Sequence, residues 1–200
     1  MMHRKAIATY LLLFGLTYCS WAQRHVMPQA PRNDVKATFL SIFSGSSRFT
    51  YERALSPSTS AEVTFGAIGL GYDMMNRAAP AGVVLKGAWK YNLHSATRGK
   101  SPLNGLYLKP ELIYANYRYD DKPSHAPLEK DTPRSHTIRW ALMAEGGWQH
   151  CWRWFLTDIY MGLGPSWGDI NAHNYYHGIM LFPKGGHLAF TAGCRIGIAW

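Results

Sequence analysis

The chain has 200 residues and a formal net charge of +9, from 21 Lys and Arg residues against 12 Asp and Glu residues. A basic total of this size is compatible with nucleic acid, but no Lys/Arg-rich run and no nucleic-acid-binding motif occurs, so we expect no nucleic-acid partner. A basic surface would instead suit anionic lipid headgroups or the phosphates of lipopolysaccharide.

The first 22 residues are predicted to be a cleaved secretory signal peptide. Residues 4–5 are basic, residues 6–19 form an apolar core too short to span a bilayer, and residues 20–22 form a small-x-small cleavage site. An uncleaved anchor or a buried helix is the alternative, and the bulky residue before Cys19 disfavours a lipoprotein signal. Cleavage would leave 178 residues with a net charge of +7, enough for one domain with a substantial core.

The remaining chain has apolar residues at every second position, in segments bounded by turn-forming residues. It contains no capped, 3.6-periodic stretch of useful length and no second apolar run long enough for a helical membrane span. Strands of this kind either close as a small barrel or split into a sandwich. After a short segment at 23–34, we expect one all-β domain over 35–200, an eight-stranded antiparallel barrel with strands at 35–44, 47–55, 60–73, 81–92, 105–119, 135–150, 154–167 and 187–200.

Each predicted strand has one bulky apolar face and one face of small residues with single charges. A soluble barrel buries the apolar face, whereas a transmembrane barrel turns it toward lipid, and alternation alone does not separate the two. The small residues of the polar face favour the transmembrane form, because the interior of an eight-stranded barrel holds only side chains. Aromatic residues near the strand ends also favour it, as an interfacial girdle; they are Trp89, Tyr91, Trp148, Trp152, Trp154 and Trp200 at one end, and Tyr72, Tyr117, Tyr119 and Trp167 at the other.

The connections between the predicted strands are asymmetric in length. With the N-terminus in the periplasm, the outward loops would be 45–46, 74–80, 120–134 and 168–186, which include the two longest, and the inward turns are shorter apart from 93–104. Bacterial outer-membrane barrels show this asymmetry. We therefore expect a monomer in the outer membrane of a Gram-negative bacterium, without an open pore, that displays loops 120–134 and 168–186 outside the cell.

Five acidic and five basic side chains fall on the predicted interior face. Burying an unpaired charge is costly, so a plugged barrel should carry matched signs, whereas a solvated polar face needs no such balance. The sequence therefore predicts an interior charge network composed of Glu52, Glu62, Lys86, Lys90, Lys109, Glu111, Arg139, Glu145, Asp158 and Arg195.

Three segments together carry two short motifs, Tyr-Glu-Arg and Tyr-x-Lys-Pro-Glu: FTYERALSPSTSAEVTFG (49–66), GVVLKGAWKYNL (82–93) and GLYLKPELIYANY (105–117). These segments resemble an uncharacterised family of small outer-membrane β-barrels from Bacteroidetes-type bacteria, whose members share both motifs. The resemblance implies no activity, since the family has no established chemistry. The final AGCRIGIAW is similar to the C-terminal strand signal that the barrel-assembly machinery recognises, which implies this machinery as a partner and a role in assembly for Phe190, Ile196, Ile198 and Trp200.

One motif raises an enzymatic alternative. GPSWG (164–168) matches the Gly-x-Ser-x-Gly nucleophile pattern around Ser166, but the helix that this motif needs does not follow. Some eight-stranded outer-membrane barrels deacylate or acylate lipid A with a Ser and a His near the outer rim, which makes Ser166 and His136 the catalytic candidates. Because Ser166 points inward and His136 outward in the expected register, we expect no enzyme. A third alternative is a soluble barrel that binds a small apolar ligand.

No cofactor and no metal are expected. His173 and His177 have i, i+4 spacing, which binds metal from one face of a helix, but they lie in a predicted loop. Cys151 and Cys194 could form a disulfide, yet Cys151 falls in a predicted inner turn and Cys194 within the last strand, which keeps them apart, so we expect free thiols or small apolar fillers. Pro110 interrupts a predicted strand and cannot donate to a ladder, which predicts a bulge.

Overall fold

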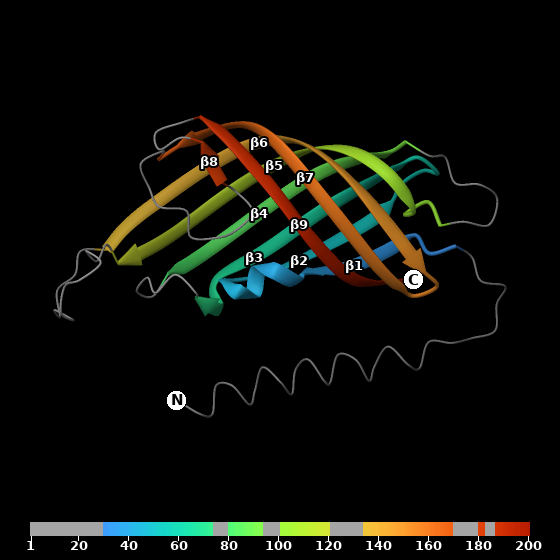
Figure 1. The fold of residues 1–200 in the computed structure, drawn as a ribbon, viewed down its shortest axis with the longest axis horizontal. Helices are drawn as coiled ribbons and strands as arrows, with labels where there is room; N and C mark the ends of the chain where they lie inside the picture. The colour runs from blue at the N-terminus through green and yellow to red at the C-terminus, as the bar shows by residue number, and fades with distance from the viewer. Residues whose placement is uncertain (1–29, 74–79, 94–100, 121–133, 170–179, 183–186) are drawn as a thin grey trace, which may run out of the picture.

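The structure is a computed structural model that describes residues 30–73, 80–93, 101–120, 134–169, 180–182 and 187–200. The predicted signal peptide at 1–22 lies outside these residues. None of the described residues forms a helix with the length and apolarity that a membrane crossing requires. The elements in chain order (Figure 1) are β1 (Asn33–Thr38), the 3-10 helix η2 (Phe39–Phe43), β2 (Ser44–Ala54), β3 (Thr59–Asp73), β4 (Ala81–Asn92), β5 (Gly105–Asp120), β6 (Arg134–Trp152), β7 (Phe155–Gly168), β8 (Met180–Phe182) and β9 (Leu188–Ala199).

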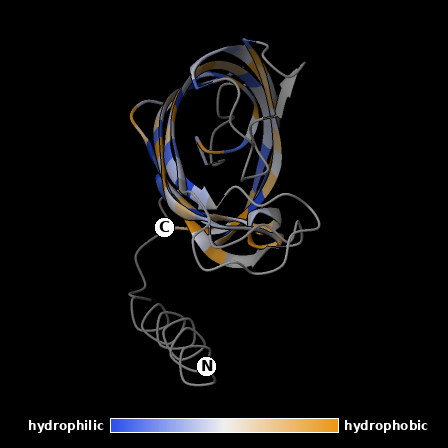
Figure 2. Ribbon diagram, turned by 90° about the vertical axis from the view of Figure 1, so that its left-hand side faces the viewer, coloured by the Kyte–Doolittle hydropathy of each residue, from blue (hydrophilic) through white to orange (hydrophobic). Residues whose placement is uncertain are grey.

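Eight of these strands form a closed antiparallel barrel. Strands β1 to β7 pair in sequence order, β7 pairs with β9, and β9 returns to β1 through pairs such as Val35 with Ile198. The N–H groups of Arg32 and Asn33 both donate to the Trp200 oxygen at 3.1 Å, which ties the start of β1 to the residue that follows β9. Figure 2 looks along the barrel and shows its wall as an oval ring. The predicted all-β, eight-stranded antiparallel barrel is confirmed.

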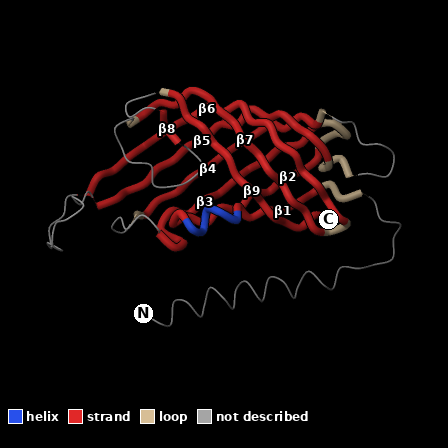
Figure 3. Tube along the Cα trace, viewed as in Figure 1, coloured by secondary structure: helices blue, strands red, loops and turns tan. Residues whose placement is uncertain are grey.

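The first strand is shorter than predicted. β1 ends at Thr38, and the chain turns through η2, the short helix in Figure 3, where Ser41 Oγ donates to the Thr38 carbonyl at 2.7 Å. The turn predicted at 45–46 is therefore wrong, because these residues belong to β2. Apolar residues in η2, such as Phe39 and Ile42, are exposed and extend the apolar pattern past the end of the strand, which explains the error.

A short strand that the pattern did not predict lies beside β9. Residues Leu188 to Phe190 pair with β7 on one edge and with β8 on the other, where Met180 is opposite Phe190. β1 occupies that same edge of β9 farther along, from Arg195 to Ala199. β8 thus covers part of the β9 edge that the short β1 leaves open.

Pro110 is accommodated without a bulge. β4 and β5 keep one register on both sides of it, since Ala88 pairs with Glu111 and Tyr91 with Leu108, while the two rungs between these described pairs are missing. On its other edge, β5 pairs continuously with β6. The predicted bulge is therefore wrong: the missing N–H interrupts one ladder locally and leaves the register unchanged.

The two faces of the wall have opposite character. Large apolar side chains point outward, with Met161 63% exposed, whereas the charged face of each strand points into the barrel. Seven aromatic residues of the predicted girdle are exposed, and the side chain of Tyr72 lies outside the description. The two remaining assignments are wrong: Tyr117 and Tyr119 are 1% and 6% exposed, because they share the inward face of β5 with Lys109.

Apolar clusters fill the interior on either side of the charged middle. The cluster near the chain ends contains Leu103, which comes from the β4–β5 connection, is 0% exposed and packs with Ala54, Leu156 and Ala199. Ser101 Oγ donates to the Pro31 carbonyl at 2.7 Å and accepts the Leu103 N–H at 3.2 Å. The long inner turn therefore folds back into the mouth of the barrel. The cluster toward the other end consists of Ile68, Val84, Ile113, Ala115, Tyr117, Tyr119, Ala141, Met143 and Ala189.

Removing the Leu103 side chain tests this role of the inner turn. We expect Leu103→Ala to lower the free energy of unfolding by about 2–5 kcal/mol, because it leaves a cavity in a buried cluster. Leu93→Ala, at an exposed position at the other end of the same connection, is the matched control and should have a much smaller effect. Denaturant-induced unfolding of both variants measures the difference, and equal losses would contradict the packing of Leu103 in the mouth.

Candidate functional site: the interior charge network

The ten charged side chains predicted for the interior lie on the inward face of the barrel, each 6% exposed or less. They project from seven strands, one or two from each of β2, β3, β4, β5, β6, β7 and β9. In each strand the charged residues stand an even number of positions apart, as in Lys86 and Lys90 of β4, so that they share one face. The wall therefore directs charge from nearly every strand into one enclosed space.

Sequence reasoning missed three buried charges, Asp34, Lys36 and Arg48. The signal was available, since Asp34 and Lys36 alternate with the outward-facing Val35 in the same period of two. Asp34 was assigned to the segment before the first strand because strand boundaries are the least certain part of a pattern. With these three, the buried charges of the described residues comprise six acids and seven bases, and all eight strands of the barrel contribute.

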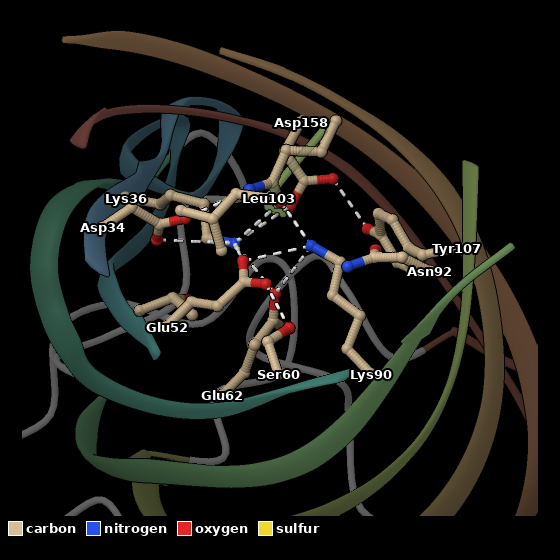
Figure 4. A network of polar contacts seen from close by, with 12 residues as sticks. Asp34, Lys36, Glu52, Ser60, Glu62, Lys90, Asn92, Leu103, Tyr107 and Asp158 are labelled. Carbon is tan, nitrogen blue, oxygen red and sulfur yellow. Dashed lines mark hydrogen bonds and ion pairs between the residues drawn. The ribbon is translucent and has the colours of Figure 1, made fainter. Parts of the chain in front are cut away.

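Lys36 occupies the centre of the network (Figure 4). Its Nζ lies 2.5 Å from Glu52 Oε2, 2.8 Å from Glu62 Oε1 and 3.5 Å from Asp158 Oδ2. It also donates to Gln149 Oε1 at 3.2 Å. A residue of the short first strand therefore joins carboxylates of β2, β3 and β7.

A second cation, Lys109 of β5, extends the network toward the other end of the barrel. Its Nζ lies 2.6 Å from Glu62 Oε2, 2.9 Å from Glu111 Oε2 and 3.1 Å from Glu145 Oε2. Glu111 also pairs with Lys86 at 2.7 Å. Glu62 contacts both Lys36 and Lys109, so the two groups of ion pairs form one connected network.

Two tyrosines complete the polar interior. Tyr107 Oη donates to Asp158 Oδ1 at 2.7 Å, and its ring lies 4.0 Å from Lys90 Nζ. The guanidinium of Arg195 stacks 4.3 Å from the Tyr160 ring centroid while its Nε lies 3.0 Å from Asp158 Oδ2. Cation–π contacts of this kind stabilise buried cations in addition to their ion pairs.

Glycines on the interior face make room for these tyrosines. A Cβ at Gly147 would lie 2.4 Å from Tyr107 Oη, and one at Gly193 would lie 2.6 Å from Tyr160 Oη. Real Cβ atoms do not approach other atoms so closely. The small residues of the polar face are thus needed where a large side chain crosses the interior.

This arrangement makes a filled core of paired charges. The buried carboxylates of the network lie against cations, and the described residues contain no group of His, Cys, Asp or Glu side chains arranged to hold a metal ion. Buried charge pairs with many hydrogen bonds are far more favourable than isolated ones, and removing a single partner is strongly destabilising. The network is therefore suited to holding the wall in one register; His173 and His177 lie outside the described residues.

Ser166 and His136 are not brought together. Ser166 is buried on the inward face of β7, whereas His136 is exposed on the outer face of β6, with its Nε2 2.8 Å from Asn116 Oδ1. Cys151 and Cys194 are both free, on strands that β7 separates. The four residues of the proposed assembly signal lie on the outward face of β9 and at its end: Phe190, Ile196, Ile198 and Trp200.

No protein-family model and no curated protein matches this sequence, so the resemblance to a Bacteroidetes-type family stays a prediction. Among solved structures, the chain is similar to the crystal structure of the N-terminal beta-barrel domain of Pseudomonas aeruginosa OprF. The similarity has a TM-score of 0.47 and 10% sequence identity, and it covers 86% of this chain and 98% of that chain.

Replacing the central lysine tests the network. Lys36→Met should lower the free energy of unfolding by about 3–5 kcal/mol, because Glu52 would keep a buried charge without its nearest cation and Glu62 would lose one of its cations. Adding Glu52→Gln should recover part of this loss, with a coupling of about 0.5–3 kcal/mol in a double-mutant cycle. Arg118→Met, at an exposed site, is the control and should change stability by less than about 0.5 kcal/mol. A Lys36→Met variant as stable as this control would refute the role of Lys36.

Two adjacent glycines offer a matched test of interior space. Gly147→Ala should destabilise the barrel by about 1–3 kcal/mol, because the new methyl overlaps Tyr107. Gly146→Ala faces outward, where its methyl would meet Leu108 at 3.4 Å, and should be tolerated. Thermal unfolding of the two variants measures the contrast; equal midpoints would mean that Tyr107 does not need the space.

Proposed function

We propose that the protein is a monomeric outer-membrane β-barrel of structural and interaction type, which displays its outward loops, predicted at 120–134 and 168–186, outside a Gram-negative cell and has no open pore. The observation that carries this proposal is the inverted polarity of the barrel. Its charges are enclosed and its large apolar side chains are exposed around the wall, which is the arrangement that lipid requires and water disfavours.

The exposed apolar side chains come from every strand of the barrel. Among them are Phe49 of β2, Phe65 of β3, Leu85 of β4 and Leu112 of β5, all about half exposed. Soluble monomers rarely expose large contiguous apolar patches, because such surfaces aggregate in water. A continuous apolar band on all sides therefore supports a hydrocarbon environment.

The two ends of the barrel differ in a way that supports the proposed orientation. The start of β1, the end of β9, the turns 55–58 and 153–154 and the described residues 101–104 lie at one end, which would be periplasmic. The connections predicted to reach outside leave from the other end, and most of their residues lie outside the described part. Exposed tryptophans such as Trp148 and Trp152 near the proposed periplasmic end suit a membrane interface.

The partners in this proposal are outer-membrane lipid and lipopolysaccharide around the wall and the barrel-assembly machinery at β9. The outward residues Ile196, Ile198 and Trp200 give this last strand the apolar pattern and aromatic end expected of an assembly signal. The charged interior argues against the soluble alternative, because an apolar ligand would have to displace paired charges such as Lys36 and Glu52.

No catalytic role is part of this proposal. The opposite facing of Ser166 and His136 supports this view, since a general base must lie within hydrogen-bond reach of its nucleophile. Lipid A mass spectra of wild-type, deletion and Ser166→Ala strains should be identical. A change on deletion that Ser166→Ala reproduces would favour the lipid-modifying alternative.

Cell fractionation tests the location directly. We expect the protein in the outer-membrane fraction, extractable with detergent and with an electrophoretic mobility that changes on heating, as folded barrels show. Recovery as a soluble periplasmic protein would refute the proposal.

One pair of substitutions separates a lipid-facing wall from a water-facing wall. Met161 lies midway along β7 and is 63% exposed. Met161→Arg should weaken folding into lipid vesicles by about 2–4 kcal/mol if the wall faces lipid, but should be nearly neutral if it faces water. Leu93→Arg, in the turn after β4, is the control and should be tolerated in both environments.

A further inference from the structure

The end of the barrel that would be periplasmic has an unusual distribution of charge. Its acidic side chains that the structure describes, Asp34, Glu52 and Asp158, are buried in the interior network. The charged side chains that it exposes among the described residues are Arg32, Arg53 and Arg153. The outer rim at this end is therefore basic, and its positive charge is not matched by acidic side chains of the described rim.

Two of these arginines line a cavity on the outer surface. The cavity has a volume of about 280 Å³ and is lined by Arg32, Asn33, Arg53, Ala54 and Leu55. Arg53 lies directly opposite Asn33 in the β1–β2 ladder, so the strand pairing places the backbone of Arg53 beside the start of β1. No acidic residue lines the cavity, and each guanidinium offers donors in a fork that fits the oxygens of a phosphate.

The outer surface becomes less polar from the cavity toward the middle of the barrel. Tyr51 comes next on the outer face, with its Oη donating to Asn33 Oδ1 at 3.0 Å. It pairs with Val35, and farther along β2 the exposed Phe49 pairs with Ala37. From the barrel end toward the middle, the surface thus runs from cationic to amphipathic to apolar, which is the order of polarity in a phospholipid from headgroup to acyl chain.

We propose that this cavity binds the headgroup phosphate of an anionic phospholipid in the periplasmic leaflet, with an acyl chain lying over Tyr51, Val35 and Phe49. The inference rests on the proposed membrane location, and it adds a specific lipid site and a lipid class to it. An anionic lipid is favoured over a zwitterionic one because two guanidinium groups without an acidic partner in the cavity wall attract net negative charge. Lipopolysaccharide would lie at the opposite end of the barrel in the proposed orientation.

Native mass spectrometry tests the site. The full chain is released from detergent micelles that contain equimolar phosphatidylglycerol and phosphatidylcholine, and the retained lipid is identified. We expect wild type to retain phosphatidylglycerol with a preference of about tenfold or more, because both lipids offer a phosphate but the choline cation of phosphatidylcholine is repelled by the two arginines. The double variant Arg32→Gln/Arg53→Gln should lose this preference. Arg118→Gln is the matched control, since it removes an exposed arginine near the opposite end, and it should keep the preference.

The outcomes separate failure of this site from failure of the proposed function. A protein that folds in micelles but shows no preference for phosphatidylglycerol would overturn the lipid site and leave the membrane location intact. A preference that survives in the double variant would overturn the assignment to this cavity, and displacement of the lipid by inorganic phosphate would show a soluble-anion site instead. A chain that remains folded and soluble without detergent would overturn the membrane location itself.

Discussion

The rest of the barrel depends on the position of one carboxylate, that of Glu62. It lies 2.8 Å from Lys36, 2.6 Å from Lys109 and 3.3 Å from Arg195, which project from three other strands. Lys90 of β4 lies 3.6 Å away, so four cations share this carboxylate and link β3 to β1, β4, β5 and β9. None of these strands can slip in register without breaking an ion pair. Because charges enclosed in this way are stable only when matched, the network constrains every strand that faces it.

This interior decides what the exterior must be. The inward positions of each strand hold charges, tyrosines and the glycines that make room for them, so the large apolar residues at the alternating positions can only point outward. In a soluble barrel the same residues would form the core. Here Leu103 and the cluster around Tyr117 close the interior with apolar side chains, while the charged middle remains enclosed. The charges pair inside the barrel, and the apolar residues that alternate with them therefore form its outer surface.

Period-two alternation was sufficient to predict the barrel and the facing of its charged residues, because most of these charges stand between apolar neighbours, as Lys90 stands between Trp89 and Tyr91. The prediction failed where the direction of a side chain depends on contacts with distant strands as well as on the local pattern. The pattern did not identify Lys36 as part of the network, although it alternates correctly, because the carboxylates that pair with it come from other strands. Tyr117 was assigned to the girdle by its residue type, although its position on β5 placed it inside. The burial of Leu103 had no local signal, since the residues that pack against it, Ala54, Leu156 and Ala199, lie at the ends of three other strands.

A filled interior restricts where the protein can act on other molecules. The carboxylates around Lys36 and Lys109 are paired with cations, so a ligand that bound them would disrupt the pairs that hold the wall together. Recognition must then occur at the ends and on the outer surface, where side chains can change without disturbing the network. The cavity lined by Arg53 is an example. Arg53 follows the buried Glu52 directly in β2 and lies on the opposite, outer face of the same strand. Adjacent residues of one strand thus serve two separate purposes, stability inside and binding outside.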